Sequence, residues 1–131
     1  MIFLVDDNDE FRTALEELVR TLGYEVRAFA AAEPALAGLT ADRRRVDLLI
    51  TDIRLPRMDG LKLVERCRRT RPALPVVVIS SMPGDIEWER GRGDGHTEFL
   101  RKPIRMAQLK AAIESATSAR GALATAQPSD S

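Results

Sequence analysis

The sequence predicts an α/β fold in which a parallel five-stranded sheet carries helices on both faces. Two observations predict it: short apolar runs alternate with segments of helical periodicity, and the helical segments are long enough to connect parallel strands. The 131 residues suffice for one substantial core but not for two, and the composition, 44% hydrophobic and 31% charged, is ordinary for a globular domain. We therefore expect a single folded domain.

The chain opens with a strand followed by an amphipathic helix. Residues 2–5 are apolar at every position, which is typical of a strand buried on both faces. Asn8 or Asp9 is expected to cap the helix, and Gly23 stands where a C-cap glycine belongs. The apolar stripe of this helix consists of Phe11, Leu15, Leu18, Val19 and Leu22.

The middle of the chain continues the alternation. A second strand is predicted over 24–29 and a third over 46–51, and a short helix with Pro34 in its first turn lies between them. A third helix is expected to begin near Gly60. The apolar positions of these two helices are Leu36 and Leu39 in one, and Leu61, Val64 and Cys67 in the other.

The last third supplies two strands and the final helix. Residues 76–80 form the most β-branched run, and a short strand follows at 98–101. Between them, at 82–95, no apolar residue follows Ile86 at helical spacing, and three glycines fall within five residues, so we predict one helical turn at most and otherwise a glycine-rich loop. The final helix has Met106, Leu109, Ile113 and Ala116 as its stripe.

Charge and cysteine content exclude several classes of protein. The chain has 20 basic and 20 acidic residues, so we expect neither a direct nucleic-acid partner nor attraction to a membrane. Cys67 is the single cysteine and favours a reducing, cytoplasmic setting. The apolar start is too short for a signal peptide, and no apolar stretch approaches a membrane span in length. The single histidine, His96, is expected to face solvent.

Acidic side chains, together with a serine and a lysine, stand where the predicted strands end. Asp6 and Asp7 follow the first strand, Asp52 the third, Ser80 ends the fourth, and Lys102 follows the fifth. Ligands of parallel sheets bind beyond the carboxyl ends of the strands, so these side chains should share one edge. Adjacent carboxylates suit a hard cation such as Mg²⁺, and a carboxylate can also act as a nucleophile.

These residues and their surroundings resemble the receiver domain of two-component response regulators over roughly residues 1 to 117. The most specific stretch is 52–60, which matches the family's segment at Asp52, Pro56, Met58, Asp59 and Gly60. The other matching segments are Val5-Asp6-Asp7, Ser80 after an apolar strand, and Lys102-Pro103.

The resemblance implies a flavodoxin-like, doubly wound sheet of order 2-1-3-4-5, with the fourth helix degraded in this chain. It implies that Asp52 is the phosphoacceptor and that Lys102 pairs with the phosphoryl group. Mg²⁺ would be bound directly by Asp7, Asp52 and the backbone carbonyl of Arg54, with Asp6 acting mainly through a water.

Further roles follow from the same resemblance. Ser80 would be the hydroxyl switch and Phe99 the aromatic switch, while Arg54 and Met82 would tune how long the phosphoryl group lasts. The Lys102–Pro103 peptide bond is expected to be cis. We expect a receiver domain over 1–119 and a flexible tail over 120–131.

The resemblance predicts a phosphorylation-controlled switch rather than an enzyme acting on other substrates. A sensor histidine kinase or a histidine phosphotransfer protein would phosphorylate Asp52 and alter a surface read by an unknown output partner. The alternative is a receiver-like interaction module whose 82–95 loop binds a partner independently of phosphorylation. An aspartate-nucleophile phosphohydrolase is rejected because its second acid would stand at position 54, and a flavin-binding module because acids follow the first strand.

Overall fold

The computed structural model describes the backbone of residues 1–42, 45–81 and 96–124, and the side chains as far as Ser118. Its five parallel strands form one sheet of order β2-β1-β3-β4-β5, as predicted. The strands are β1 (Ile2–Val5), β2 (Val26–Phe29), β3 (Leu48–Asp52), β4 (Val76–Ser80) and β5 (Thr97–Arg101). The described helices are α1 (Asp9–Thr21), α2 (Ala32–Ala41), α3 (Gly60–Thr70) and α5 (Met106–Ala124).

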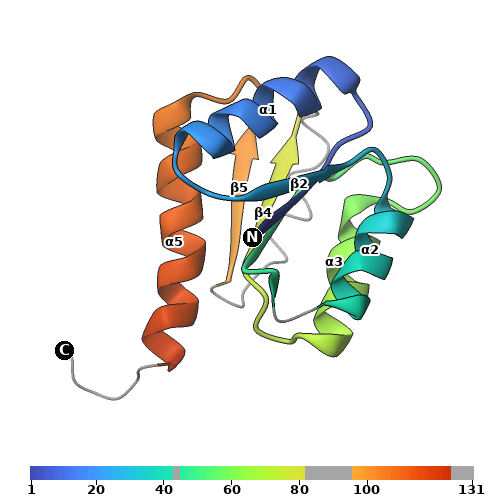
Figure 1. Cartoon of the computed structure of the whole chain (residues 1–131), viewed down its shortest axis with the longest axis vertical. Helices are drawn as coiled ribbons and strands as arrows, with labels where there is room; N and C mark the ends of the chain where they lie inside the picture. Colours follow the sequence, from blue (N-terminus) through green and yellow to red (C-terminus); the bar gives the residue numbers. More distant parts are fainter. Residues whose placement is uncertain (43–44, 82–95, 125–131) are drawn as a thin grey trace.

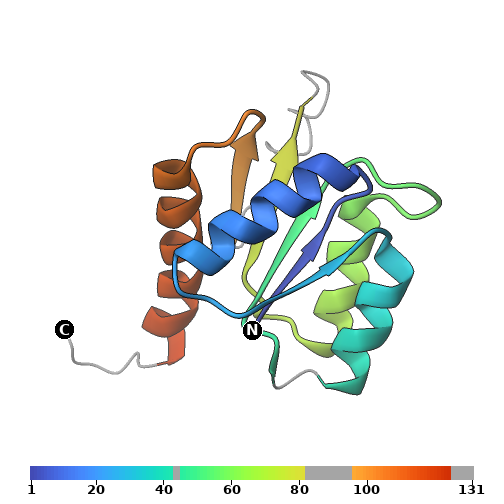
Figure 2. The same cartoon turned by 45° about the horizontal axis from the view of Figure 1, so that its top comes forward.

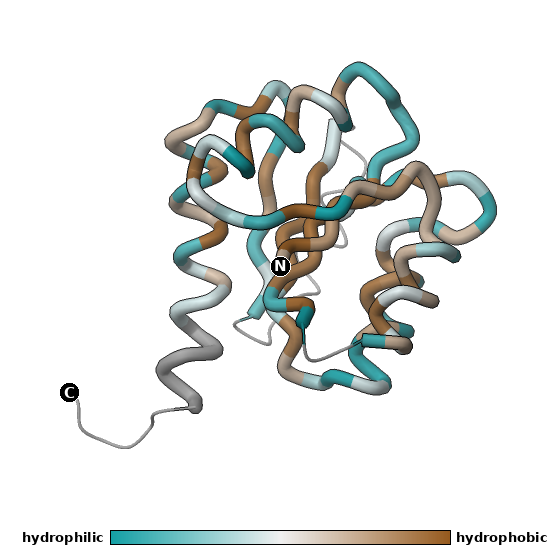
Figure 3. Tube along the Cα trace, viewed as in Figure 1, coloured by the Kyte–Doolittle hydropathy of each residue, from teal (hydrophilic) through white to brown (hydrophobic). Residues whose placement is uncertain are grey.

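The molecule has three layers, with α1 and α5 on one face of the sheet and α2 and α3 on the other (Figures 1 and 2). Each face has its own hydrophobic cluster, because successive strand residues point to opposite sides. Leu4 and Ile50 pack beneath α1 and α5, whereas Val5 and Leu49 pack beneath α2 and α3. Hydrophobic residues accordingly run along the central strands (Figure 3). The prediction of helices on both faces is confirmed.

The ends of the helices are defined by local chemistry. The Asn8 side chain accepts a hydrogen bond from the backbone N–H of Phe11 at 2.8 Å, which identifies Asn8 as the cap of α1. Asp59 caps α3 in the same way through Lys62 N–H at 2.8 Å. Gly23 follows α1 with φ of 100°, a backbone conformation that glycine adopts without strain, as the sequence predicted.

Three expectations about single positions were wrong. Leu61 is 40% exposed, and Leu63 takes its place on the inner side of α3. Met106 is also exposed, whereas His96 is buried rather than facing solvent. The backbone of α5 is helical as far as Ala124.

Two strands begin later than the sequence predicted. β2 begins at Val26 rather than at residue 24, and β3 covers Leu48–Asp52 rather than 46–51. The predicted loop at 82–95, including Met82, lies outside the described residues. No helix in the described part of the chain is long and apolar enough to cross a membrane.

Candidate functional site

The carboxyl ends of β1 and β3 place three aspartates together. The register pairs Val5 with Thr51, so that Asp6 and Asp52 follow at the same level of the sheet. Asp6 and Asp52 are buried, at 1% and 6% exposure, while Asp7 is exposed. One carboxylate oxygen from each of the three lies within 4.8 Å of the other two. The predicted convergence of these acids is therefore present.

Lys102 brings a positive charge to this cluster from the end of β5. Its ammonium lies 2.9 Å from Oδ2 of Asp52 and 3.3 Å from Oδ2 of Asp6. The backbone N–H of Lys102 donates to the carbonyl of Ser80 at 2.9 Å, which ties the residue to the end of β4. The Lys102–Pro103 bond is cis, as expected.

The charges of this cluster perturb each other. Burial raises the pKa of Asp6, against the opposing effects of the Asn8 backbone N–H and the Lys102 ammonium. Burial alone would lower the pKa of Lys102, but the hydrogen bond and charge of Asp52, together with the charge of Asp6, raise it above its ordinary value. Lys102 is thus held in its charged form between two carboxylates.

One lysine does not compensate three carboxylates. Oδ2 of Asp6 is buried and accepts no well-formed hydrogen bond from the described residues. This oxygen and the carboxylates of Asp7 and Asp52 are the kind of oxygen ligand that Mg²⁺ takes in proteins. The donor set therefore fits the metal expected from the sequence.

The side chain and the backbone of Asp52 are both held by neighbouring residues. Its Oδ1 accepts a hydrogen bond from the Arg54 backbone N–H at 2.9 Å, while Oδ2 contacts Lys102. The start of α3 packs against its backbone, since the Gly60 N–H donates to the Ile53 carbonyl at 2.8 Å. A β-carbon at Gly60 would lie 2.2 Å from the Asp52 carbonyl oxygen. Glycine is required here for space.

Two residues of α1 belong to the site although the sequence analysis gave them no role there. The Lys102 ammonium lies 4.1 Å from the centre of the Phe11 ring. Arg12 donates to the carbonyl of Asp6 at 2.8 Å and to Oδ1 of Asp9 at 2.6 Å. The sequence analysis assigned Phe11 only to the apolar stripe of α1. Its position in the first helical turn after the acids was the one feature of the sequence that could have indicated a place in the site.

The predicted switch residues Ser80 and Phe99 and the predicted tuning residue Arg54 differ in how deeply they are buried. Ser80 is buried at the end of β4 and pairs in register with Arg101, next to Lys102. Phe99 is partly buried and packs against the cluster beneath α2 and α3. The Arg54 side chain is exposed.

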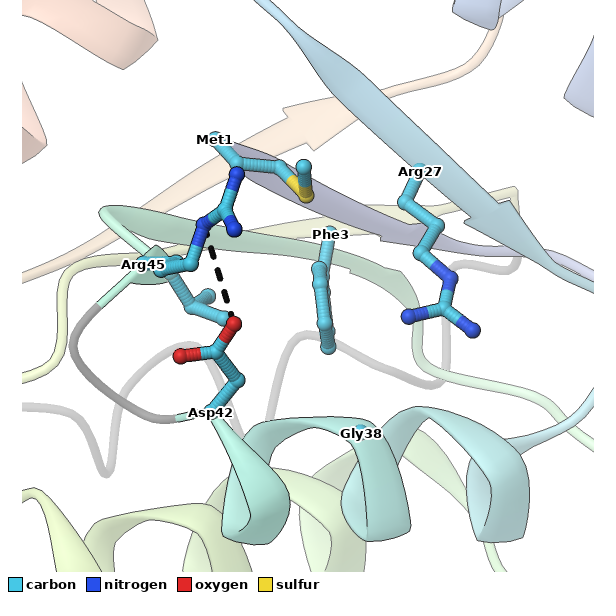
Figure 4. Close-up of a pocket in the computed structure, with 7 residues that line it drawn as sticks. Met1, Phe3, Arg27, Gly38, Asp42 and Arg45 are labelled. Atoms are coloured by element: carbon cyan, nitrogen blue, oxygen red, sulfur yellow. Dashed lines mark ion pairs between the residues drawn. The ribbon is translucent and has the colours of Figure 1, made fainter.

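Two hollows lie at opposite ends of the sheet. One of about 270 Å³ lies over the segment that joins β3 to α3 and is lined by Ile53, Arg54, Leu55, Asp59 and Leu61. The other, of about 150 Å³, lies by the amino end of β1 over the Phe3 ring, with Arg27 and Gly38 on its sides (Figure 4). Arg45 at this second hollow is paired with Asp42 at 3.6 Å, and neither hollow is lined by Asp6, Asp7 or Asp52. The candidate site is therefore the cluster of three carboxylates with Lys102 rather than either hollow.

The order of the strands and this acidic edge with its lysine define a receiver domain. Residues 2–114 match the response regulator receiver domain, and the chain belongs to this family, the receivers of two-component response regulators.

Its relatives include longer regulators. The chain is 37% identical over 109 residues to the C4-dicarboxylate transport transcriptional regulatory protein DctD of Rhizobium meliloti, a match covering 82% of this chain and 23% of that protein. It is 33% identical over 112 residues to the transcriptional regulatory protein AfsQ1 of Streptomyces coelicolor, covering 86% and 48%. The chain thus spans less than half the length of these relatives.

Solved receiver domains share the fold. The receiver domain of NtrX from Brucella abortus is 32% identical with a TM-score of 0.76, covering 90% of this chain and 98% of that one. The receiver domain of the sensor histidine kinase PA1611 from Pseudomonas aeruginosa is 28% identical with a TM-score of 0.76, covering 89% and 96%, and holds a magnesium ion in its active site cleft.

Proposed function

We propose that this receiver domain accepts a phosphoryl group on Asp52 and thereby switches a surface that a partner reads. The observation that carries the proposal is the Asp52 carboxylate, held through Oδ1 by the Arg54 N–H and lying 2.9 Å through Oδ2 from the Lys102 ammonium. A carboxylate fixed in this way can act as a nucleophile toward phosphorus. The charge of the transferred group would be met by a cation already in place.

Mg²⁺ would be held by Asp7 and Asp52 with the backbone carbonyl of Arg54, and by Asp6 mainly through a water. The ion would supply charge neutralisation for the phosphoryl oxygens. The proposal is supported by the buried Oδ2 of Asp6, which contacts the Lys102 ammonium only at 3.3 Å among the described residues and lies beside the other two acids.

The transfer itself needs little beyond positioning. An oxygen of the Asp52 carboxylate forms the new bond to phosphorus, and the bond from phosphorus to the donor breaks, with its electron pair leaving on the donor group. Lys102 then pairs with a phosphoryl oxygen, and the Ser80 hydroxyl donates to another. The added group carries about −1.5 to −2 charges at neutral pH, which would draw Ser80 toward it. Phe99 would follow by packing, and Arg54 and Met82 would tune the lifetime.

The donor would be a sensor histidine kinase or a histidine phosphotransfer protein, as for receivers generally. The chain would act in the cytoplasm, without direct nucleic-acid contact and without acting as an enzyme on other molecules. The balance of 20 basic and 20 acidic residues supports only the absence of nucleic-acid contact, since it leaves no net field toward DNA. The alternative, a phosphorylation-independent module, rests on the 82–95 loop, which lies outside the described residues.

The deciding experiment is the intact mass of the protein after incubation with a small phosphodonor and Mg²⁺. We expect one added phosphoryl group on the wild type and none on Asp52→Ala. Asp42→Ala is the matched control, because Asp42 lies by the other hollow and pairs only with Arg45 among the described charges. Uptake by Asp52→Ala equal to that of the wild type, or none by the folded wild type, would contradict the proposal.

A further inference from the structure

The ammonium of Lys102 has partners of two kinds, carboxylates and an aromatic ring. Its carboxylate partners are Asp52 at 2.9 Å and Asp6 at 3.3 Å. The Phe11 ring of α1, with its centre 4.1 Å from Nζ, is a third partner that carries no formal charge. An aromatic face attracts a cation through the negative potential above the ring.

The Phe11 ring can also limit the movement of the Lys102 side chain. Lys102 has a flexible four-carbon stem and is one-fifth exposed, so its ammonium can swing from the acids into water. Phe11 is part of the first turn of α1, whose start is fixed by the cap hydrogen bond from its own N–H to Asn8. It packs against the cluster beneath α1 and α5, which limits the movement of the ring.

We propose that Phe11 is a positioning residue that holds the Lys102 ammonium against Asp52 in readiness for the phosphoryl group. This inference rests on the proposed function for its catalytic consequence, but the contact itself can be tested without any transfer. Phe11 acts through Lys102 and touches no reacting atom. Its contribution would be to remove the cost of bringing the ammonium into place at each transfer.

The direct test is the NMR signal of the Lys102 side chain in protein labelled at lysine. The chain has three lysines, Lys62, Lys102 and Lys110, and the other two are exposed, so they serve as internal references. A ring over the ammonium should shift the Lys102 side-chain protons upfield of those of the other two. Phe11→Leu should abolish the shift while keeping an apolar side chain, and Phe11→Tyr should retain it.

The functional test is the rate of phosphorylation by a small phosphodonor with Mg²⁺, followed by intact mass over a range of donor concentrations. A cation–ring contact of ordinary strength predicts that Phe11→Leu slows the saturated rate roughly threefold to tenfold. Phe11→Tyr should restore the rate. Tyr24→Leu, which removes an exposed ring in the loop between α1 and β2 at the amino end of the sheet, is the matched control and should leave the rate unchanged.

The outcomes separate this inference from the proposed function. If the folded wild type takes up no phosphoryl group but Phe11→Leu still abolishes the upfield shift of the Lys102 protons, the proposed function fails and the contact between Phe11 and Lys102 is supported. If the wild type is phosphorylated and Phe11→Leu leaves both the Lys102 signal and the saturated rate unchanged, the positioning role is wrong. A changed signal with an unchanged rate also overturns it.

Discussion

Gly60, the first residue of α3, packs so closely on Asp52 that a β-carbon on it would lie 2.2 Å from the Asp52 carbonyl oxygen. The colliding atom belongs to backbone, which cannot rotate away as a side chain can. The buried end of β3 and the start of α3 are thereby locked together beneath the site.

Gly60→Ala should therefore damage the site as well as the fold. We expect a loss of about 1–3 kcal/mol in the free energy of unfolding, as for other overpacked positions, and slower phosphorylation of Asp52. Urea unfolding and intact mass would measure the two effects. Gly23→Ala is the control: its φ of 100° costs about 1–2 kcal/mol of strain, but nothing lies within 4 Å, so phosphorylation should persist. Equal phosphorylation of both variants would show that the close approach to Asp52 is irrelevant to the chemistry.

Mg²⁺ should stabilise the folded protein through the acidic cluster. At a concentration 100-fold above its dissociation constant, the ion would add about 2.7 kcal/mol to the free energy of unfolding. Asp7→Asn should lose most of this gain without harming the apo fold, because Asp7 is exposed. Thermal unfolding with Mg²⁺ and with a chelator would measure it, and Asp47→Asn should respond like the wild type. An undiminished gain in Asp7→Asn would remove Asp7 from the ligand set.

Lys102→Gln should remove the cation that Asp52 meets at 2.9 Å. Losing a preorganised donor to a developing charge typically costs about 10²-fold in rate, so phosphorylation by a small donor should slow by that order. Lys62→Gln is the control, since Lys62 pairs with Glu65 on the exposed side of α3. Similar rates for the two variants would leave Lys102 without the proposed role.

Cys67 should make stability fall at high pH. Burial raises the pKa of its thiol from 9.0 to about 12, so the folded state keeps a proton that the unfolded chain releases. This contribution is complete below pH 9 and is lost at up to about 1.4 kcal/mol per pH unit as the pH rises toward 12. Urea unfolding at pH 8 to 11 should show a steeper loss for the wild type than for Cys67→Ala. Parallel pH profiles would assign the loss to other groups.

Leu63 and Leu61 should differ sharply in their effect on stability. Leu63 is fully buried, so Leu63→Ala should cost about 2–5 kcal/mol. Leu61 is 40% exposed, and Leu61→Ala should stay within about 0.5 kcal/mol of the wild type. Chemical denaturation measures both, and a large loss for Leu61→Ala would restore the orientation of α3 expected from the sequence.

The elements and the acidic edge were predictable from the sequence because both depend on local patterns. Continuous apolar runs mark strands buried on both faces, and in a parallel sheet the residues after those runs must meet at one edge. The sequence therefore predicts that Asp6, Asp52 and Lys102 lie together, and their distances confirm the convergence.

The inward side of α3 was decided by packing. A stripe of Leu61, Val64 and Cys67 was expected from apolar residues alone, since glycine carries no hydrophobic signal. In the structure Gly60 must face the Asp52 backbone, and this turns Leu63, Val64 and Cys67 inward and Leu61 outward.

Contacts between distant elements were likewise invisible in the sequence. Phe11 lies on the apolar stripe of α1, and nothing local shows that Lys102, 91 positions later, reaches its ring. His96 reads as a polar residue beside glycines, yet the start of β5 buries it. Periodicity predicts which side of an element is apolar, while the partner on that side is set by how the layers stack.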